Sequence, residues 1–278
     1  MFLACPDSVL VAVVRGEWCR GTMPSPPESK TTISAETQPL SLFPAVRDFA
    51  LHVGAAVAIQ TMVFQPFTIP SASMEPGLLV GDYLIVSKFA YGWSRASLPL
   101  DPPLREGRLS GRLPDRGDVV VFRRPSSPSD VWIKRVIALP GDHIEIRNGL
   151  VIVNGLPLPQ TRHGPGLDPD APLRTVQRVE ERQPSGRRYV TFDLGSGQAG
   201  DSRAPEVVPE GYLFVMGDHR DNSLDSRWPE EVGVGLLPVE NLVGRAEIVV
   251  ASWHPGAALL KPWTWSDLRS GRFLQRVR

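Results

Sequence analysis

An apolar segment at residues 46–64 ends where prolines begin, and this boundary limits how the rest of the chain can fold. At 1.5 Å per residue the segment could form about 28 Å of α-helix, close to the ~30 Å hydrocarbon core of a bilayer. Pro66 and Pro70 prevent a regular helix from continuing beyond it. We therefore expect one helix at residues 43–66, and we interpret it as a transmembrane helix.

The composition of this helix leaves two other interpretations open. It is rich in Ala and Gly, it contains His52 and Gln60, and Arg47 and Asp48 lie in its first turn. A buried or interfacial helix is the second interpretation, and a secretory signal peptide is the third. Basic residues precede the segment and none follows until Lys88, which favours an N-terminus inside the cell and the bulk of the chain outside.

Turn-forming residues dominate the chain after the helix. The sequence has 28 prolines and 25 glycines but few long helical patterns, which predicts a mainly β, mostly antiparallel structure with many turns. Asn148-Gly149, between two alternating runs, is the clearest hairpin signal. Short strands are expected at residues 67–69, 83–86, 119–122, 132–138, 143–146, 150–153, 188–192, 212–216 and 246–252.

Changes in composition divide the chain into parts. Residues 1–40 are rich in Pro, Ser, Thr and Glu and predict a disordered tail, and a side hypothesis places the true start at Met23. Residues 156–206 are polar and rich in Pro, Arg and Gly, which is typical of an insertion, and we expect an inserted β-rich or loop subdomain. A basic, Trp-containing tail closes the chain, either solvated or at a membrane interface. The remaining parts are the β-domain, residues 67–155 and 207–253, and the tail, residues 254–278.

Charge and cysteine usage exclude several classes of protein. The 30 basic and 30 acidic residues give a formal net charge of zero, so nothing favours binding to nucleic acid. Both cysteines, Cys5 and Cys19, precede the apolar segment, which excludes a disulfide framework or a Cys-based zinc site after residue 19. The five histidines lack the spacing of paired metal ligands. We expect neither a metal nor a cofactor.

Two segments together indicate nucleophilic chemistry. Ser71 and Ser73 lie directly after the predicted helix, but a serine nucleophile needs a base, and no histidine lies in a known triad pattern. Lys134 interrupts an apolar strand, where alternation places it on the face of Trp132 and Val136. Burial there would lower its pKa and make it a base near neutral pH. Protection of a sheet edge is the ordinary interpretation of such a lysine.

A third segment, residues 217–227, is almost wholly polar. A calcium loop that starts at Asp218 is excluded, because Ser223 stands where glycine is needed and Pro229 where glutamate is needed. A solvated turn is the ordinary interpretation. Its alternating acids and arginines could instead form internal ion pairs that hold a rigid loop, with one hydroxyl left to orient a neighbour.

Five segments, residues 69–76, 81–83, 116–122, 134–142 and 217–227, together resemble the bacterial type I signal peptidases. These are membrane-anchored Ser/Lys proteases that remove signal peptides from exported proteins. The resemblance implies their mostly antiparallel β-domain, preceded by one N-terminal transmembrane helix. It also implies a single-pass protein of the cytoplasmic (inner) membrane, with the catalytic domain on the extracytoplasmic side and the lipid bilayer as a partner.

The resemblance assigns roles to individual residues. Ser73 would be the nucleophile and Lys134 the general base, while the Ser73 backbone N–H and the Ser71 hydroxyl would form the oxyanion hole. Ser223 would orient the lysine amine. His219 stands where Asn is common in the family, and we interpret it as a structural substitution. Two ion pairs would support the loop, Asp218 with Arg135 and Asp225 with Arg227.

The resemblance also implies a substrate. Preproteins that carry signal peptides would bind as an added strand, with small residues in two shallow pockets, the Ala-x-Ala rule. The expected pocket residues are Phe67, Ile69, Pro70, Met74, Leu78, Trp132 and Ile133. Two competing hypotheses are a self-cleaving Ser/Lys protein of the repressor-protease type and a membrane-tethered β-domain that binds peptides without cutting them.

Overall fold

The computed structural model describes residues 42–98, 107–254, 256–257 and 261–278. The chain separates into two compact units, Met1–Ala45 and Val46–Arg278. The predicted disordered tail at residues 1–40 and the alternative start at Met23 lie outside the described residues.

The predicted helix is present as α1 (Leu42–Met62). Within the described part of the chain, no helix combines the length and the apolar character that crossing a bilayer requires. The assignment of residues 43–66 as a transmembrane helix stays a prediction. The sequence of α1 is rich in Ala and carries the Arg47–Asp48 ion pair, with nitrogen and oxygen 2.9 Å apart.

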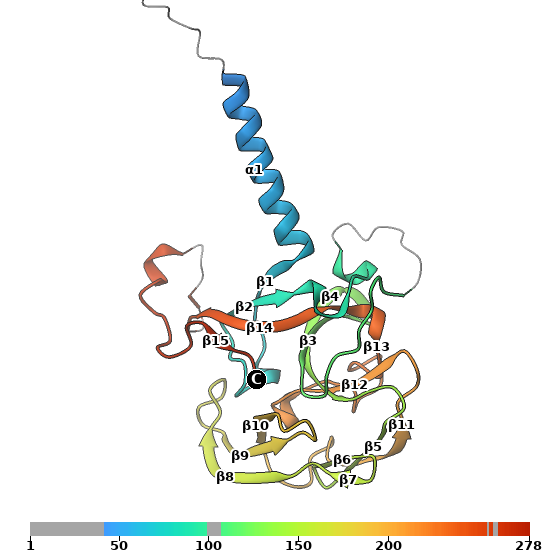
Figure 1. Cartoon of the computed structure of the whole chain (residues 1–278). Coiled ribbons are helices and arrows are strands. Elements are labelled where there is room, and N and C mark those ends of the chain that lie inside the picture. The colour runs from blue at the N-terminus through green and yellow to red at the C-terminus, as the bar shows by residue number, and fades with distance from the viewer. Residues whose placement is uncertain (1–41, 99–106, 255, 258–260) are drawn as a thin grey trace, which may run out of the picture. The chain divides into compact units, whose positions relative to one another are not determined.

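The largest sheet has eight strands, and all of its pairings are antiparallel. Its order is β1-β2-β14-β3-β4-β12-β13, and β15 pairs with β14 (Figure 1). The predicted antiparallel β-rich fold is confirmed. The strands are β1 (Phe64–Thr68), β2 (Asp82–Ser87), β3 (Val119–Arg124), β4 (Ser127–Ala138), β12 (Tyr212–Met216), β13 (Leu237–Pro238), β14 (Leu242–Ser252) and β15 (Gln275–Arg276).

A four-stranded sheet in the order β11-β5-β6-β7 contains the predicted hairpin. Asn148 and Gly149 both have positive φ angles, 50° and 77°, which the two-residue turn between β5 and β6 requires and which asparagine and glycine adopt readily. The strands of this sheet are β5 (His143–Arg147), β6 (Leu150–Val153), β7 (Leu156–Pro157) and β11 (Arg203–Val207).

The inserted block at residues 156–206 has more order than its composition predicts. Besides β7 and β11 it forms a separate three-stranded sheet, drawn in yellow-green to yellow in Figure 1, where the sequence predicts a single strand. This inserted sheet consists of β8 (Gln160–Leu167), β9 (Thr175–Arg182) and β10 (Arg188–Asp193). The short 3-10 helices of the chain are η1 (Ala72–Met74), η2 (Lys88–Tyr91), η3 (Arg95–Ser97), η4 (Arg220–Asn222), η5 (Val239–Asn241) and η6 (Pro262–Thr264).

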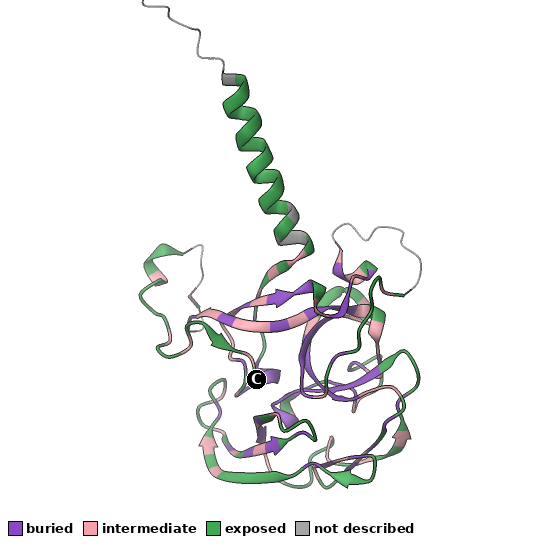
Figure 2. Ribbon diagram, in the orientation of Figure 1, coloured by how far each residue is buried: buried purple, intermediate pink, exposed green. Residues whose placement is uncertain are grey.

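The core lies on both faces of the central strands. Along β3, Val119 and Val121 pack into one hydrophobic cluster while Val120 and Phe122 pack into another, as expected when successive side chains point to opposite faces. The second half of β4, from Ile133 onward, is buried throughout (Figure 2). Any polar side chain in this stretch is consequently removed from water.

Candidate active site

Ser73 is held on a tight turn between β1 and β2. It lies in η1, and the residue is 8% exposed. The turn is fixed by backbone hydrogen bonds from Glu75 N–H to Ala72 O (3.0 Å) and from Leu78 N–H to Met74 O (2.9 Å). Met74 has no exposed surface and belongs to the main core cluster, so the residue after Ser73 anchors the turn in the core.

Lys134 reaches this serine from β4. Its Nζ lies 2.7 Å from Ser73 Oγ and donates a second hydrogen bond to the carbonyl oxygen of Ile133 (3.0 Å). The lysine is 4% exposed, and its amine lies 5.5 Å from the centre of the Trp132 ring. The structure thus brings together the two residues that the sequence predicts as nucleophile and base, although they are 61 positions apart.

Burial changes the acid–base chemistry of this amine. It lowers the pKa of Lys134 from 10.5 to about 8, because the charged form loses its hydration. The carboxylates of Asp225 and Asp218 oppose this by favouring the ammonium, and the Arg227 guanidinium adds to the decrease. A large fraction of the amine is therefore neutral at pH 8 and able to accept the Ser73 proton.

Both predicted ion pairs are present beneath the amine. Arg135 binds Asp218 through two hydrogen bonds of 2.7 and 2.6 Å, and both side chains are about 1% exposed. Arg227 binds Asp225 in the same way, with two contacts of 2.9 Å, and Asp225 also accepts the backbone N–H of Gly217. Burial alone would raise the pKa of Asp225, but the Arg227 charge holds it below its usual range. The pairs connect the loop to β4 and hold it in place.

Two further hydroxyls approach the dyad. Ser71 is exposed, and its Oγ lies 3.4 Å from Ser73 Oγ. Ser223 is buried, and no hydrogen bond joins its Oγ to Lys134, so its predicted orienting role stays a prediction. Gly217 permits this arrangement, because a Cβ atom there would lie 2.3 Å from Ser223 Oγ and 2.4 Å from the Ser73 carbonyl oxygen.

A cavity of about 470 Å³ opens over the dyad. Three of the predicted pocket residues line it, namely Pro70, Trp132 and Ile133. Of the other four, Ile69, Met74 and Leu78 are buried in the core cluster that contains Val119 and Val121, and Phe67 packs against that cluster, because apolar residues beside the serine also fill the sheet interior. Sequence reasoning missed five lining residues, although all of them lie in or beside the segments at 132–138 and 217–227: Val131, Asp221, Asn222, Leu224 and Trp228.

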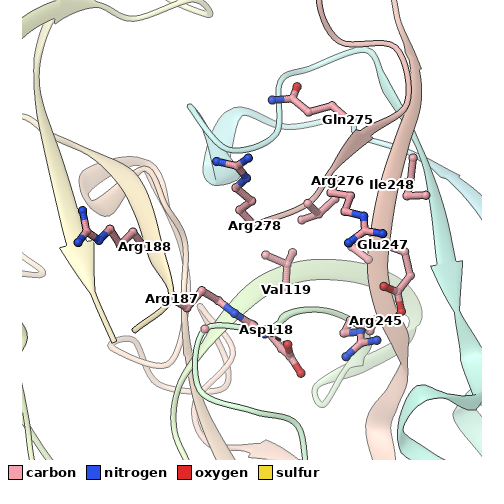
Figure 3. A pocket seen from close by; sticks show the side chains of 13 residues that line it. Asp118, Val119, Arg187, Arg188, Arg245, Glu247, Ile248, Gln275, Arg276 and Arg278 are labelled. Carbon is pink, nitrogen blue, oxygen red and sulfur yellow. Dashed lines mark hydrogen bonds and ion pairs between the residues drawn. The ribbon is translucent and has the colours of Figure 1, made fainter. Parts of the chain in front are cut away.

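A larger cavity of about 920 Å³ has a different character (Figure 3). It contains five arginines but no serine, and Figure 3 shows Arg187 beside Asp118, with which it forms an ion pair of 2.5 Å. It shares no lining residue with the cavity over the dyad. Arg135 connects to its wall, donating hydrogen bonds to the main-chain oxygens of Gly117 (2.8 Å) and Arg278 (2.7 Å). Of these two cavities, only the smaller is lined by Ser73 and Lys134.

No metal site accompanies the dyad in the described part of the chain. There, no group of three or more His, Cys, Asp or Glu side chains is arranged to hold an ion.

Glu75, two residues after the nucleophile, gives a testable pH dependence. It is 1% exposed, and burial, with the Asp168 and Asp170 carboxylates, raises its pKa to about 7 from 4.5. In the folded protein the ionised form of Glu75 is therefore disfavoured. The free energy of unfolding falls as the pH rises from about 4.5 to about 7, by up to about 3 kcal/mol. We expect Glu75→Gln to increase the thermal midpoint more at pH 8 than at pH 5.

Glu210→Gln, at an exposed glutamate, is the control for that measurement and should leave the midpoint nearly unchanged at both pH values. An equal gain from Glu75→Gln at pH 5 and pH 8 would contradict the prediction, because the benefit would then be unrelated to ionisation.

Comparison with known proteins gives the family of this chain. The family described as "Signal peptidase, peptidase S26" matches residues 43–253. The chain is 34% identical over 236 residues to a signal peptidase I of Rickettsia canadensis (78% of this chain, 87% of that protein). It is 33% identical over 234 residues to that of Rickettsia typhi (77% and 86%). A solved signal peptidase I from Enterococcus faecalis V583 is 26% identical, covers 48% of this chain and 97% of its own, and has a TM-score of 0.29. The chain therefore belongs to the signal peptidase family, peptidase S26, and is a peptidase.

Proposed function

We propose that this peptidase is a serine endopeptidase that cleaves signal peptides from exported preproteins, with Ser73 as nucleophile and Lys134 as general base. The observation that carries the proposal is the 2.7 Å contact between Ser73 Oγ and an amine whose pKa burial has lowered to about 8. A base must lie within hydrogen-bond reach of the proton that it removes and have a pKa near the working pH. Lys134 meets both conditions.

The reaction would proceed by acyl transfer. Ser73 Oγ attacks the scissile carbonyl carbon while Lys134 takes the hydroxyl proton. The C–N bond then breaks, and the lysine returns that proton to the leaving amine. Water, deprotonated by the same lysine, attacks the acyl-enzyme; the bond to Ser73 Oγ breaks, the lysine returns the proton to that oxygen, and the carboxylate product is released. The Ser73 backbone N–H and the Ser71 hydroxyl would stabilise the oxyanion, and losing one such donor costs about 3 kcal/mol.

The sheet topology supports binding of the substrate as an added strand. One edge of β4 pairs with β3, but on the other edge the pairing with β12 begins only at Arg135. Residues 127–134 therefore have no neighbour on that edge among the described strands. This unpaired edge ends at Lys134 and borders the cavity over the dyad. A peptide with small residues, as in the Ala-x-Ala rule, would place its scissile bond there.

Preproteins are accordingly the proposed partners. We place the reaction at the lipid bilayer, on the extracytoplasmic side of the cytoplasmic membrane, on the strength of the motif resemblance. Cell fractionation with external protease tests this location: resistance of the enzyme to protease in spheroplasts would contradict it.

Two substitutions test the dyad. Ser73→Ala and Lys134→Met should each reduce cleavage of an Ala-x-Ala peptide to about one thousandth or less, because the two residues act as a unit. Detergent-solubilised protein is incubated with the peptide, and the cut is located by mass spectrometry. Ser266→Ala and Lys261→Met, at exposed positions away from β4, are the matched controls and should retain full activity. Peptide binding without cleavage by the wild-type protein would favour the peptide-binding β-domain.

The lowered pKa of the lysine predicts the direction of the pH profile. Because only the neutral amine accepts a proton, kcat/KM should rise with pH and level off above an apparent pKa of about 8. Measurement of kcat/KM from pH 5 to pH 10 checks this. A profile that is already flat at pH 6 would show that another group is the base.

A further inference from the structure

The inserted sheet, β8 to β10, contributes no residue to the dyad or to the cavity above it. It nevertheless carries two fully buried carboxylates, Asp168 in the turn between β8 and β9 and Glu181 near the end of β9. Burying an ionised carboxylate costs several kcal/mol unless it is paired and hydrogen-bonded. The partners of these two acids therefore indicate what the insertion does.

Asp168 binds the loop at residues 217–227. Its Oδ2 lies 3.1 Å from His219 Nε2. Because a carboxylate oxygen can only accept, Nε2 carries the hydrogen and donates it. The same oxygen accepts a hydrogen bond from Arg174 Nε (2.7 Å). Its Oδ1 accepts the backbone N–H groups of Asp170 (3.0 Å) and Ala171 (3.3 Å). Burial alone would raise the pKa of Asp168, but the bonds from His219 and Arg174 hold it below its usual range. The acid is a fixed, ionised anchor.

Glu181 binds the next residue of the same loop. Its two carboxylate oxygens accept hydrogen bonds from both terminal nitrogens of Arg220. They also accept hydrogen bonds from Tyr189 Oη and Gln160 Nε2, each at 3.1 Å. The Arg220 charge holds the pKa of Glu181 below its usual range despite its burial. Two adjacent loop residues, His219 and Arg220, are thus held by two acids of the inserted sheet.

The loop in turn holds the nucleophile. The backbone N–H of His219 donates to the carbonyl oxygen of Ser73 (3.1 Å). On its other side, Phe192 of β10 donates its N–H to Asp218 O (2.9 Å), and its ring packs edge-on against the His219 imidazole at 5.7 Å. A continuous series of buried contacts therefore runs from the inserted sheet through His219 to Ser73.

We propose that the inserted sheet positions the nucleophile, with Asp168 and Glu181 acting through His219 and Arg220 to keep Ser73 in reach of Lys134. The inference rests on the proposed peptidase reaction. A displacement of about 1 Å in a reacting group can cost about 100-fold in rate. Ser73 lies on a three-residue turn, so contacts from outside that turn determine its position.

Matched substitutions in the full-length protein test the inference. Asp168→Asn and Glu181→Gln keep the shape of each side chain but remove its charge. We expect kcat to fall about tenfold or more and KM to change less than about twofold, because the lining of the cavity over the dyad is untouched. Asp170→Asn in the same turn and Glu180→Gln in the same strand, both at least partly exposed, should change neither constant by more than about twofold.

Two readouts separate positioning from stability alone. If the loop at residues 217–227 moves, water reaches the Lys134 amine and raises its pKa. The acid limb of the kcat/KM profile should then shift above pH 8. Hydrogen exchange at residues 217–223 should also become faster, whether or not the protein cleaves peptides. His219→Leu should reproduce the loss of kcat, whereas His219→Gln, which keeps an N–H donor near the position of Nε2, should lose less.

The outcomes distinguish this inference from the function on which it rests. If the wild-type protein and Ser73→Ala are equally inactive, the peptidase reaction is wrong, and faster exchange at residues 217–223 in Asp168→Asn and Glu181→Gln would still support the coupling. Alternatively, the wild-type protein cleaves, and both variants match it in kcat, in the pH of the acid limb of the kcat/KM profile and in the hydrogen-exchange rate at residues 217–223. In that case the inserted sheet has no positioning role. A lower thermal midpoint with unchanged kcat would overturn the inference as well.

Discussion

Removal of one amine from water is the constraint on which the site depends. Lys134 lies in the half of β4 that is buried on both faces, so its ammonium loses hydration that two hydrogen bonds do not replace. A lysine in a one-sided sheet could extend its amine into solvent and stay charged. The double cover of the central strands, with one core cluster on each face, is therefore a requirement of the chemistry as well as a source of stability.

The acids near this amine would restore its charge if they were not themselves paired. Asp218 and Asp225 both favour the ammonium, but each binds an arginine through two hydrogen bonds, which reduces its field at Lys134. A buried ion pair is weak evidence for stability, because apolar residues of similar volume often do as well. These pairs are better explained by geometry, since they fix the loop that carries Ser223 without making the lysine a permanent cation.

Local patterns predicted more of this fold than of its site. The helix, the Asn148-Gly149 hairpin and the antiparallel character follow from neighbours in sequence, and they are present. The interpretation of that helix as membrane-spanning stays a prediction, because its length fits a bilayer while α1 also contains polar and small residues. The insertion was predicted as a β-rich or loop subdomain, but β8, β9 and the contacts of Asp168 and Glu181 were missed, since the partners of these acids lie 51 and 39 positions away. Four expected pocket residues lie in the core or pack against it, because an apolar side chain beside a serine can face either way.

Charged residues that are buried far from one another in sequence give this site its single arrangement. η1 has too few residues to hold Ser73 by its own hydrogen bonds, so the serine depends on Met74 in the core, Lys134 at its hydroxyl and His219 at its carbonyl oxygen. Apolar packing alone tolerates shifts of several tenths of an ångström, whereas a paired carboxylate has few alternative geometries of similar energy. Asp168 and Glu181 lie in a sheet with its own hydrogen-bonded frame and outside the cavity over Ser73, so the proposed positioning of this serine uses residues that do not line the cavity.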